Sequence, residues 1–264
     1  MQVIECIPNF SEGRDKKKIE KIANAIKKVP EVKLLHQTSD VDHNRSVMTF
    51  IGPPEKVIEA AFRACQKAAE LINLTDHQGV HPCIGATDVI PLVPLKNISF
   101  KKCTQFAEKL GEKIGTELNI PVYLYEKAAR KPERENLANI RNKEHLTSPD
   151  FGPKKPGEAG SVAVGVREIL IAYNINLDTN DLKTAENIAK SIRESNGGLP
   201  FVKALGLSLS SRNIVQVSMN LTNYKMINIP EVYEEVGKLA KTHGVKILGT
   251  EVIGLTPEEI LENI

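Results

Sequence analysis

The sequence of 264 residues contains no tryptophan, and its aromatic residues do not alternate with basic ones. Proteins that bind single-stranded nucleic acid stack bases on such aromatic side chains, so the absence argues against a nucleic-acid partner. The charge balance agrees, because a net charge of +2 and a pI of about 8.2 are too mild for a concentrated basic face.

Long apolar runs and paired cysteines are also missing. No run approaches the roughly 20 apolar residues that a helix needs to cross a bilayer, so we expect no membrane partner. Residues 1–6 lack a basic stretch before an apolar core, which predicts no signal peptide and a cytoplasmic location. The four cysteines, Cys6, Cys65, Cys83 and Cys103, show no CxxC spacing, which predicts reduced thiols rather than disulfides or a zinc site.

One order of elements occurs twice along the chain: strand, helix, strand, strand, helix, strand. Asn9 and Asn176 each end a first strand, and each lies 36 residues before an arginine, Arg45 or Arg212. A further helix and strand follow the first unit, near residues 106–125. The other expected helices cover residues 15–28, 53–71, 181–195 and 230–243, and the other expected strands cover residues 3–8, 32–38, 47–51, 90–93, 168–176, 201–207, 214–221 and 245–253.

This repeat predicts an α+β fold of two tandem ferredoxin-like (βαββαβ) subdomains, with antiparallel sheets and helices on one face of each. We expect the first subdomain in residues 1–150 and the second in residues 151–264. The second face of each sheet would then be free to pack on the other sheet, on a dimer mate or around a ligand. Residues 130–165, rich in Pro, Gly, Lys and Glu, form a connection long enough to predict a functional role.

Residues 77–88 combine two histidines, two glycines, a proline, a thiol and a carboxylate, which a buried packing segment does not need. Gly79 and Gly85 allow positive φ or a close backbone approach, and Pro82 stiffens the turn. The combination is typical of a rigid loop that holds an imidazole at a cleft. His81 is the candidate acid–base group, because histidine titrates nearest physiological pH, although a purely structural loop histidine is the alternative.

Further blocks accompany this loop in a fixed order. They are residues 5–13 (ECIPNFSEG), 42–46 (DHNRS), 81–86 (HPCIGA), 121–125 (PVYLY), 149–153 (PDFGP), 165–167 (GVR), 172–177 (AYNINL) and 216–220 (QVSMN). Together they resemble the formiminotransferase family over nearly the whole chain.

The resemblance implies an enzyme, a transferase of one-carbon groups in histidine degradation. Its small-molecule substrates would be N-formimino-L-glutamate and tetrahydrofolate, the latter as co-substrate, and no metal would take part. The formimino group would pass to N5 of tetrahydrofolate, giving L-glutamate and 5-formiminotetrahydrofolate. The resemblance also implies a homodimer, folate in a tunnel between the two subdomains, and His81 as the catalytic residue.

The resemblance places a folate-binding segment at residues 152–160. Lys154 and Lys155, with Arg167, would face the anionic glutamyl tail of the folate, unless this is simply a flexible basic loop. The expected folate-binding residues are Gly152, Pro153, Lys154, Lys155, Pro156, Gly157, Glu158, Ala159 and Gly160.

Polar side chains at strand ends complete the expected substrate site. Arg45, at a hairpin tip with Asp40, carries a planar guanidinium that binds carboxylates through two hydrogen bonds, and glutamate substrates carry carboxylates. Asparagine offers a donor and an acceptor, which matches a pterin edge or the formimino group. Turn formation is the alternative for all of them. The strand-end candidates are Asn9, Ser11, Asn174, Asn176 and Asn220.

Three neighbours of His81 keep open roles. His77 either caps the preceding helix or joins the site, and Asp88 either orients an imidazole or caps a turn. Pro82 makes a Cys83–His81 nucleophilic pair awkward. A metal site is disfavoured, because His77 and His81 are spaced by four but Gly79 and Pro82 break the helix that such a pair needs.

The chain departs from the family pattern at two places. It stops soon after Leu255, so we expect no fused cyclodeaminase module, and residues 152–160 are compact and lack the aromatic residues of animal relatives. Formyl transfer between 5-formyltetrahydrofolate and glutamate, another pterin, and a non-catalytic folate-binding carrier therefore stay open. A regulatory pair that binds an amino acid would explain the repeat but not the loop around His81.

Overall fold

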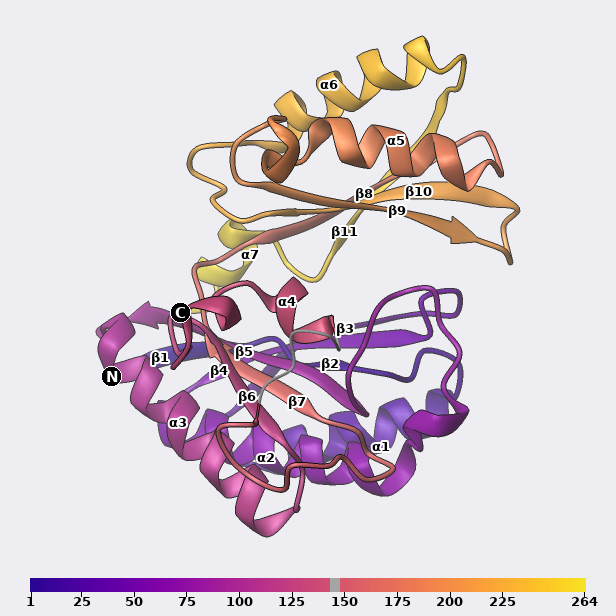
Figure 1. Cartoon of the computed structure of the whole chain (residues 1–264). Helices are drawn as coiled ribbons and strands as arrows, with labels where there is room; N and C mark the ends of the chain where they lie inside the picture. Colours follow the sequence, from indigo (N-terminus) through magenta and orange to yellow (C-terminus); the bar gives the residue numbers. More distant parts are fainter. Residues whose placement is uncertain (143–147) are drawn as a thin grey trace. The chain divides into compact units, whose positions relative to one another are not determined.

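The computed structural model describes residues 1–142 and 148–264, which form two compact units (Figure 1). The first unit comprises Met1–Arg167 and Ile264, and the second comprises Glu168–Asn263. None of the helices in these residues has the length and apolar character that crossing a bilayer would take.

The first unit is built on a seven-stranded sheet. Its elements in chain order are β1 (Val3–Cys6), β2 (Asn9–Phe10), α1 (Lys16–Lys27), β3 (Lys33–Asp40), β4 (Arg45–Gly52), α2 (Pro54–Leu71), η1 (Leu74–Asp76), β5 (Thr87–Lys96), α3 (Phe100–Glu117), β6 (Val122–Glu126), η2 (Pro132–Arg134), α4 (Leu137–Arg141) and β7 (Val162–Val166).

β1 and β2 share one position in this sheet, because both pair with β4 on one side and with β5 on the other. β3 pairs with β4 at one edge, and β7 and then β6 extend the sheet beyond β5. The β5–β7 and β6–β7 pairs are parallel, so the prediction of an antiparallel sheet is wrong here. Parallel strands need long crossovers, and α3 and residues 127–161 supply two.

Helices α1, α2 and α3 cover one face of the sheet (Figure 1). Asp15 begins α1 by accepting hydrogen bonds from the N–H groups of Lys17 and Lys18, as a good N-cap residue does. The helix then buries a stripe of apolar residues at helical spacing: Ile19, Ile22, Ala23 and Ile26.

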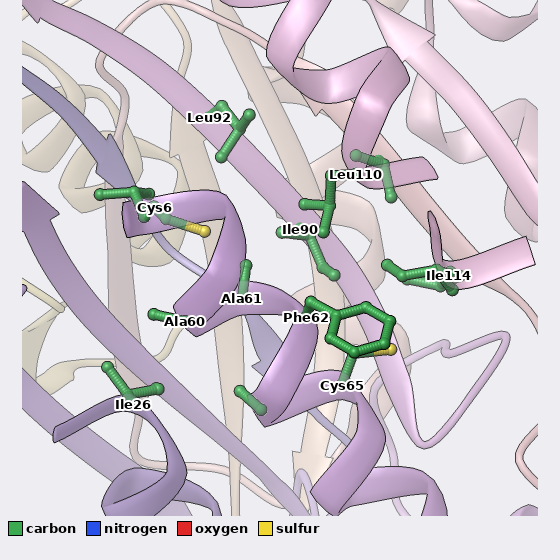
Figure 2. Close-up of a cluster of buried hydrophobic side chains, with 14 of the residues drawn as sticks. Cys6, Ile26, Ala60, Ala61, Phe62, Cys65, Ile90, Leu92, Leu110 and Ile114 are labelled. Carbon is green, nitrogen blue, oxygen red and sulfur yellow. The ribbon is translucent and has the colours of Figure 1, made fainter. Parts of the chain in front are cut away.

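Figure 2 shows the core that these helices form with the sheet. Cys6 of β1 and Leu92 of β5 belong to the same buried cluster as Ala61 of α2 and Leu110 of α3. The cysteines of this core are free thiols, as expected, and burial raises the pKa of the Cys65 thiol to about 12, so it behaves as a small apolar side chain.

The opposite face of the first sheet also carries a helix, contrary to the expectation of helices on one face. Leu137 and Ile140 of α4 pack on a small cluster that includes Tyr123 and Val89. This helix lies in the connection that separated the two repeats in the sequence. The described parts of the connection, which include α4 and β7, therefore belong to the first unit.

The boundary between the units follows Arg167 rather than residue 150. The reason is β7, whose residues pair with β5 and β6 over Val162–Val166. A strand in the middle of a sheet belongs to that sheet's unit.

The second unit carries the same order of elements as the start of the first. Its strands form a four-stranded antiparallel sheet in the order β11-β8-β10-β9, and α5 and α6 pack on one face (Figure 1). Its elements are β8 (Ile171–Leu177), α5 (Leu182–Ile192), η4 (Glu194–Asn196), β9 (Val202–Leu209), β10 (Ile214–Leu221), α6 (Ile229–Thr242), β11 (Ile247–Ile253) and α7 (Pro257–Leu261).

Glu5 is an unusual buried carboxyl in the middle of the first sheet. It pairs with Ile51 and Val93 and points away from α1, α2 and α3, since side chains alternate along a strand and Ile4 and Cys6 lie in the core that these three helices cover. The residue is 1% exposed, and its Oε2 has no hydrogen-bond partner within the described part of the chain. Burial raises the pKa of Glu5 to about 7, although the charge of Arg167 opposes the shift.

We expect Glu5→Gln to make stability less dependent on pH. Between pH 4.5 and 7 the folded protein binds a proton at Glu5 that the unfolded chain releases, so stability falls as pH rises through this window. A shift of this size corresponds to up to about 3 kcal/mol. Urea unfolding of the wild type and of Glu5→Gln at pH 5 and pH 8 measures this pH dependence of the free energy of unfolding. Equal effects of the substitution at the two pH values would contradict the buried titrating carboxyl.

Candidate active site

The imidazole of His81 lies on the loop between η1 and β5, which we call the His81 loop (residues 77–85). Its Nδ1 lies 2.9 Å from the carbonyl oxygen of Pro82. A carbonyl oxygen only accepts, so we assign the ring proton to Nδ1. Nε2 then carries a lone pair, which accepts a hydrogen bond from Nη1 of Arg45 at 2.7 Å.

The surroundings of His81 favour the neutral form of the ring. Burial lowers its pKa well below 6.5, and the positive charges of Arg45 and Arg141 lower it further, with a smaller effect from His43. The backbone carbonyl of Pro82 opposes the shift only weakly. The ring surface is partly exposed, yet protein atoms surround it closely enough to remove much of the hydration that a charged imidazole needs.

Arg45 is the first residue of β4 and follows the hairpin tip at residues 40–44. Oδ1 of Asp40 accepts hydrogen bonds from the N–H groups of Asp42 (2.9 Å) and His43 (2.8 Å), which shapes the turn. The ring of His43 stacks near His81, with 5.9 Å between the ring centroids. The hairpin thus places Arg45 and His43 beside His81, and Asp40 shapes the turn between them.

Asn44 ties the hairpin tip to two other segments. Its Oδ1 accepts from the N–H of Gly13 at 3.0 Å, and its Nδ2 donates to the carbonyl oxygen of Gln78 at 3.1 Å. The residue takes a φ of 46°, in the left-handed region that asparagine tolerates better than most residues. Val80 adds a backbone hydrogen bond to the carbonyl of Asp42 at 3.1 Å. The position of His81 relative to Arg45 therefore depends on Asn44.

His77 takes a structural place beside Asn44. Its Nδ1 lies 3.1 Å from the carbonyl oxygen of Ser11 and 3.3 Å from Nδ2 of Asn44. Burial lowers its pKa below the usual value. A cleft of about 300 Å³ opens beside this pair and is also lined by Glu12 and Lys18. His77 and Asn44 form one wall of this cleft, whereas His81 and Arg45 do not line it.

Asp88 does not orient the His81 ring directly. Its Oδ1 accepts from the N–H of Ile84 at 3.0 Å, and its Oδ2 accepts from Nη2 of Arg141 on α4. The carboxylate therefore fixes the end of the His81 loop and binds α4 to it.

Burial lowers the pKa of Arg45 to about 10, with a further contribution from Arg141, while Asp88 and Asp40 oppose the shift.

The thiol of Cys83 lies in surroundings that disfavour the thiolate. Burial raises its pKa, and the interaction with the Ser11 side chain opposes this shift. A raised pKa leaves little thiolate at neutral pH, and the thiolate is the reactive form.

The expected folate-binding segment is joined to the His81 loop through backbone hydrogen bonds. Ala86 donates to the carbonyl of Ala159 at 2.8 Å, and Ser161 donates to the carbonyl of Ile84 at 2.8 Å. Gly85 and Gly160 form an isolated bridge. A Cβ on Gly85 would lie 1.9 Å from the carbonyl oxygen of Ser161, so glycine is required there. Lys154 and Lys155, earlier in the segment, are exposed.

Two further predicted site residues lie at separate places. Asn9 of β2 donates to the carbonyl of Ile7 at 3.0 Å. Asn176 belongs to the second unit, where its Oδ1 accepts from Nε2 of Gln216 at 2.9 Å, and Gln216 also donates to Glu251 at 2.7 Å. Because side chains alternate along a strand, those of Asn176, Gln216 and Glu251 lie on the face of the second sheet opposite α5 and α6. Within the described residues, no cluster of three or more His, Cys, Asp or Glu is placed to hold a metal ion.

The chain matches the family model described as "Formiminotransferase domain, N-terminal subdomain" over residues 3–167, and the model described as "Formiminotransferase domain" over residues 172–263. The chain belongs to the formiminotransferase family. Within this family it is 45% identical to the glutamate formimidoyltransferase of Thermoplasma acidophilum, over 100% of this chain and 91% of that protein.

Other members of the formiminotransferase family are also similar to this chain over nearly all of its length. The glutamate formimidoyltransferase of Streptococcus pyogenes serotype M1 is 42% identical, over 100% of this chain and 92% of that protein. The formimidoyltransferase-cyclodeaminase of Gallus gallus is 40% identical, over 98% of this chain but only 51% of that longer protein. The family resemblance inferred from the sequence blocks is thus confirmed.

We expect Gly85→Ala to destabilise the protein and to reduce any activity that depends on His81. The new Cβ would force the His81 loop away from Ser161, a backbone clash that costs about 1–3 kcal/mol. Gly157→Ala is the matched control, since nothing lies within 4 Å of its Cβ position and a surface change is usually within about 0.5 kcal/mol. Urea unfolding measures both, and equal free energies of unfolding would refute the close approach.

We expect Arg45→Gln to raise the pKa of His81 toward 6.5, because it removes a positive charge that disfavours imidazolium. Histidine-selective NMR, with the signal assigned through His81→Gln, follows the titration in both proteins. Arg63→Gln, which removes an exposed arginine paired with Glu59 on α2, is the control. An unchanged His81 titration in Arg45→Gln would show that the guanidinium does not act on the ring.

Proposed function

We propose that this chain is a glutamate formimidoyltransferase, an enzyme that transfers the formimino group from N-formimino-L-glutamate to N5 of tetrahydrofolate. The products are 5-formiminotetrahydrofolate and L-glutamate, as in histidine degradation. The identity of 45% and 42% to full-length proteins of this name carries the proposal. The neutral imidazole of His81 supplies chemistry that suits the reaction.

The reaction needs one proton removed and one proton delivered. N5 of tetrahydrofolate attacks the formimino carbon, and a tetrahedral intermediate forms. N5 then loses a proton, the bond from the carbon to the glutamate nitrogen breaks, and that nitrogen gains a proton. Nε2 of neutral His81 can take the first proton and return it to the leaving nitrogen, so one residue serves as base and then as acid. Proximity of the two bound substrates supplies much of the remaining rate enhancement.

The Nε2 lone pair of His81 must be freed before it can act. In the structure Arg45 occupies it at 2.7 Å. A substrate carboxylate is a stronger partner for a guanidinium than a neutral imidazole is. We infer that donor binding draws Arg45 onto a carboxylate and leaves Nε2 available.

The folate side of the site rests on residues 152–160. Its backbone hydrogen bonds to the His81 loop support a role next to the reacting group. Lys154 and Lys155 are exposed and available to the anionic glutamyl tail of folate. We assign Asn9 and Asp40 of the first unit to contacts with the pterin or the formimino group, because their side chains offer polar groups on β2 and at the hairpin tip.

The finer architecture is also part of this proposal. The strand order β11-β8-β10-β9 and the βαββαβ order of the second unit support a ferredoxin-like subdomain. The first unit would be a ferredoxin-like subdomain extended by α3, β6 and β7. We propose that the enzyme is a homodimer and that it acts without a metal.

The test is a spectrophotometric assay of the purified protein with N-formimino-L-glutamate and tetrahydrofolate. We expect product with the wild type and a rate lower by about 10²-fold or more for His81→Ala, the scale of a lost general acid–base group. His243→Gln, a change at the exposed end of α6, should keep full activity.

The other outcomes separate the alternatives. Turnover of 5-formyltetrahydrofolate with glutamate, in the absence of formimino transfer, would replace the proposal with formyl transfer. Binding of tetrahydrofolate without turnover of either donor would indicate a carrier. An unchanged rate in His81→Ala would remove the assigned role of His81.

A further inference from the structure

Two arginines from distant parts of the first unit are joined to the His81 loop. Arg45, at the start of β4, donates to Nε2 of His81 at 2.7 Å. Arg141, at the end of α4, donates to Asp88, whose Oδ1 accepts from the N–H of Ile84 on the same loop at 3.0 Å. The positive charges of both arginines also disfavour protonation of His81.

Arg141 has an unmet hydrogen-bonding requirement. Its Nη2 donates to Asp88, but its Nε is buried and has no partner within the described residues. A guanidinium stays protonated in proteins, so this donor cannot be removed by losing a proton. A buried donor without an acceptor is unfavourable, and a ligand oxygen would satisfy it.

Arg45 is likewise incompletely compensated. Its hydrogen bond goes to the uncharged Nε2 of His81, and burial disfavours its charge enough to lower its pKa to about 10. The nearby carboxylates already accept hydrogen bonds from other groups. Asp40 accepts from the N–H groups of Asp42 and His43, and Asp88 accepts from the N–H of Ile84 and from Arg141.

We propose that Arg141 and Arg45 together bind a carboxylate of the amino-acid donor, so that Arg141 is a substrate-binding residue of the reaction. The identity of the donor rests on the proposed function, whereas the carboxylate site rests on the two guanidinium groups and the free Nε donor. A dicarboxylic amino-acid derivative fits this site, and Asp88 positions Arg141 within it. One carboxylate oxygen would accept from the free Nε of Arg141, and the other would accept from the guanidinium of Arg45.

Donor binding at this site would free Nε2 of His81 to accept a proton. A carboxylate between the two arginines takes Arg45 from Nε2 of the ring. It also offsets the positive charges that disfavour protonation of His81. The enzyme would thus keep its base occupied until the donor is in place.

Steady-state kinetics of Arg141→Gln and Arg141→Lys test the proposal. We expect the KM for the donor to rise by about tenfold or more in Arg141→Gln, while the KM for tetrahydrofolate changes less than about twofold. Arg141→Lys keeps the positive charge but loses the planar guanidinium that can donate two hydrogen bonds to one carboxylate, so its donor KM should lie between those of the wild type and Arg141→Gln. Arg130→Gln, an exposed arginine of the same connection that pairs with Glu108, is the matched control.

A binding measurement separates this site from a structural role and from the proposed function. Isothermal titration with glutarate, a dicarboxylate that cannot react, should give about tenfold weaker binding to Arg141→Gln than to the wild type, with Arg130→Gln unchanged. Glutarate that binds both proteins equally, or does not bind the wild type, would overturn the inference. So would a loss of kcat and melting temperature with an unchanged donor KM. If the protein shows no turnover but its binding of glutarate still depends on Arg141, only the proposed function would be refuted.

Discussion

The geometry around His81 depends on the side-chain amide of Asn44 and on the glycines that lie against backbone. Asn44 connects the hairpin tip to Gly13 and to Gln78, and Gly85 lies against Ser161 with no room for a Cβ. Backbone hydrogen bonds are short and directional, so segments joined in this way cannot shift separately. The distance between the imidazole and Arg45 is set by the packing of these segments.

Electrostatics then determine what the site can do. Burial and two guanidinium groups make protonation of His81 unfavourable, and the carbonyl of Pro82 selects the tautomer that leaves Nε2 as an acceptor. A neutral histidine at physiological pH can accept a proton, as the proposed transfer requires once N5 has attacked. The same charges that disfavour protonation of the ring also attract carboxylates, which is why we propose that this cluster both binds the donor and controls the base.

The sequence predicted the regular elements well where apolar residues recur at a clear period. Residues 15–28 were expected as a helix and form α1, and residues 181–195 contain α5. The sequence patterns predicted neither β7 nor α4 in the connection between the repeats. There, Val162–Val166 forms a strand inside the first sheet, and α4 is a five-residue helix held by Leu137 and Ile140. A short helix that is stabilised mainly by its tertiary contacts has little local signal.

The sequence by itself determined the repeated elements, the glycine- and histidine-rich loop, and the blocks that identify the family. Only the tertiary structure decided the partners of His81, because they come from distant positions. Arg45 lies 36 residues from His81, Asn44 lies 31 from Gly13, and Arg141 lies 53 from Asp88. Composition and periodicity record local preferences, whereas burial, tautomer and pKa depend on which distant groups the folded chain brings within a few ångströms.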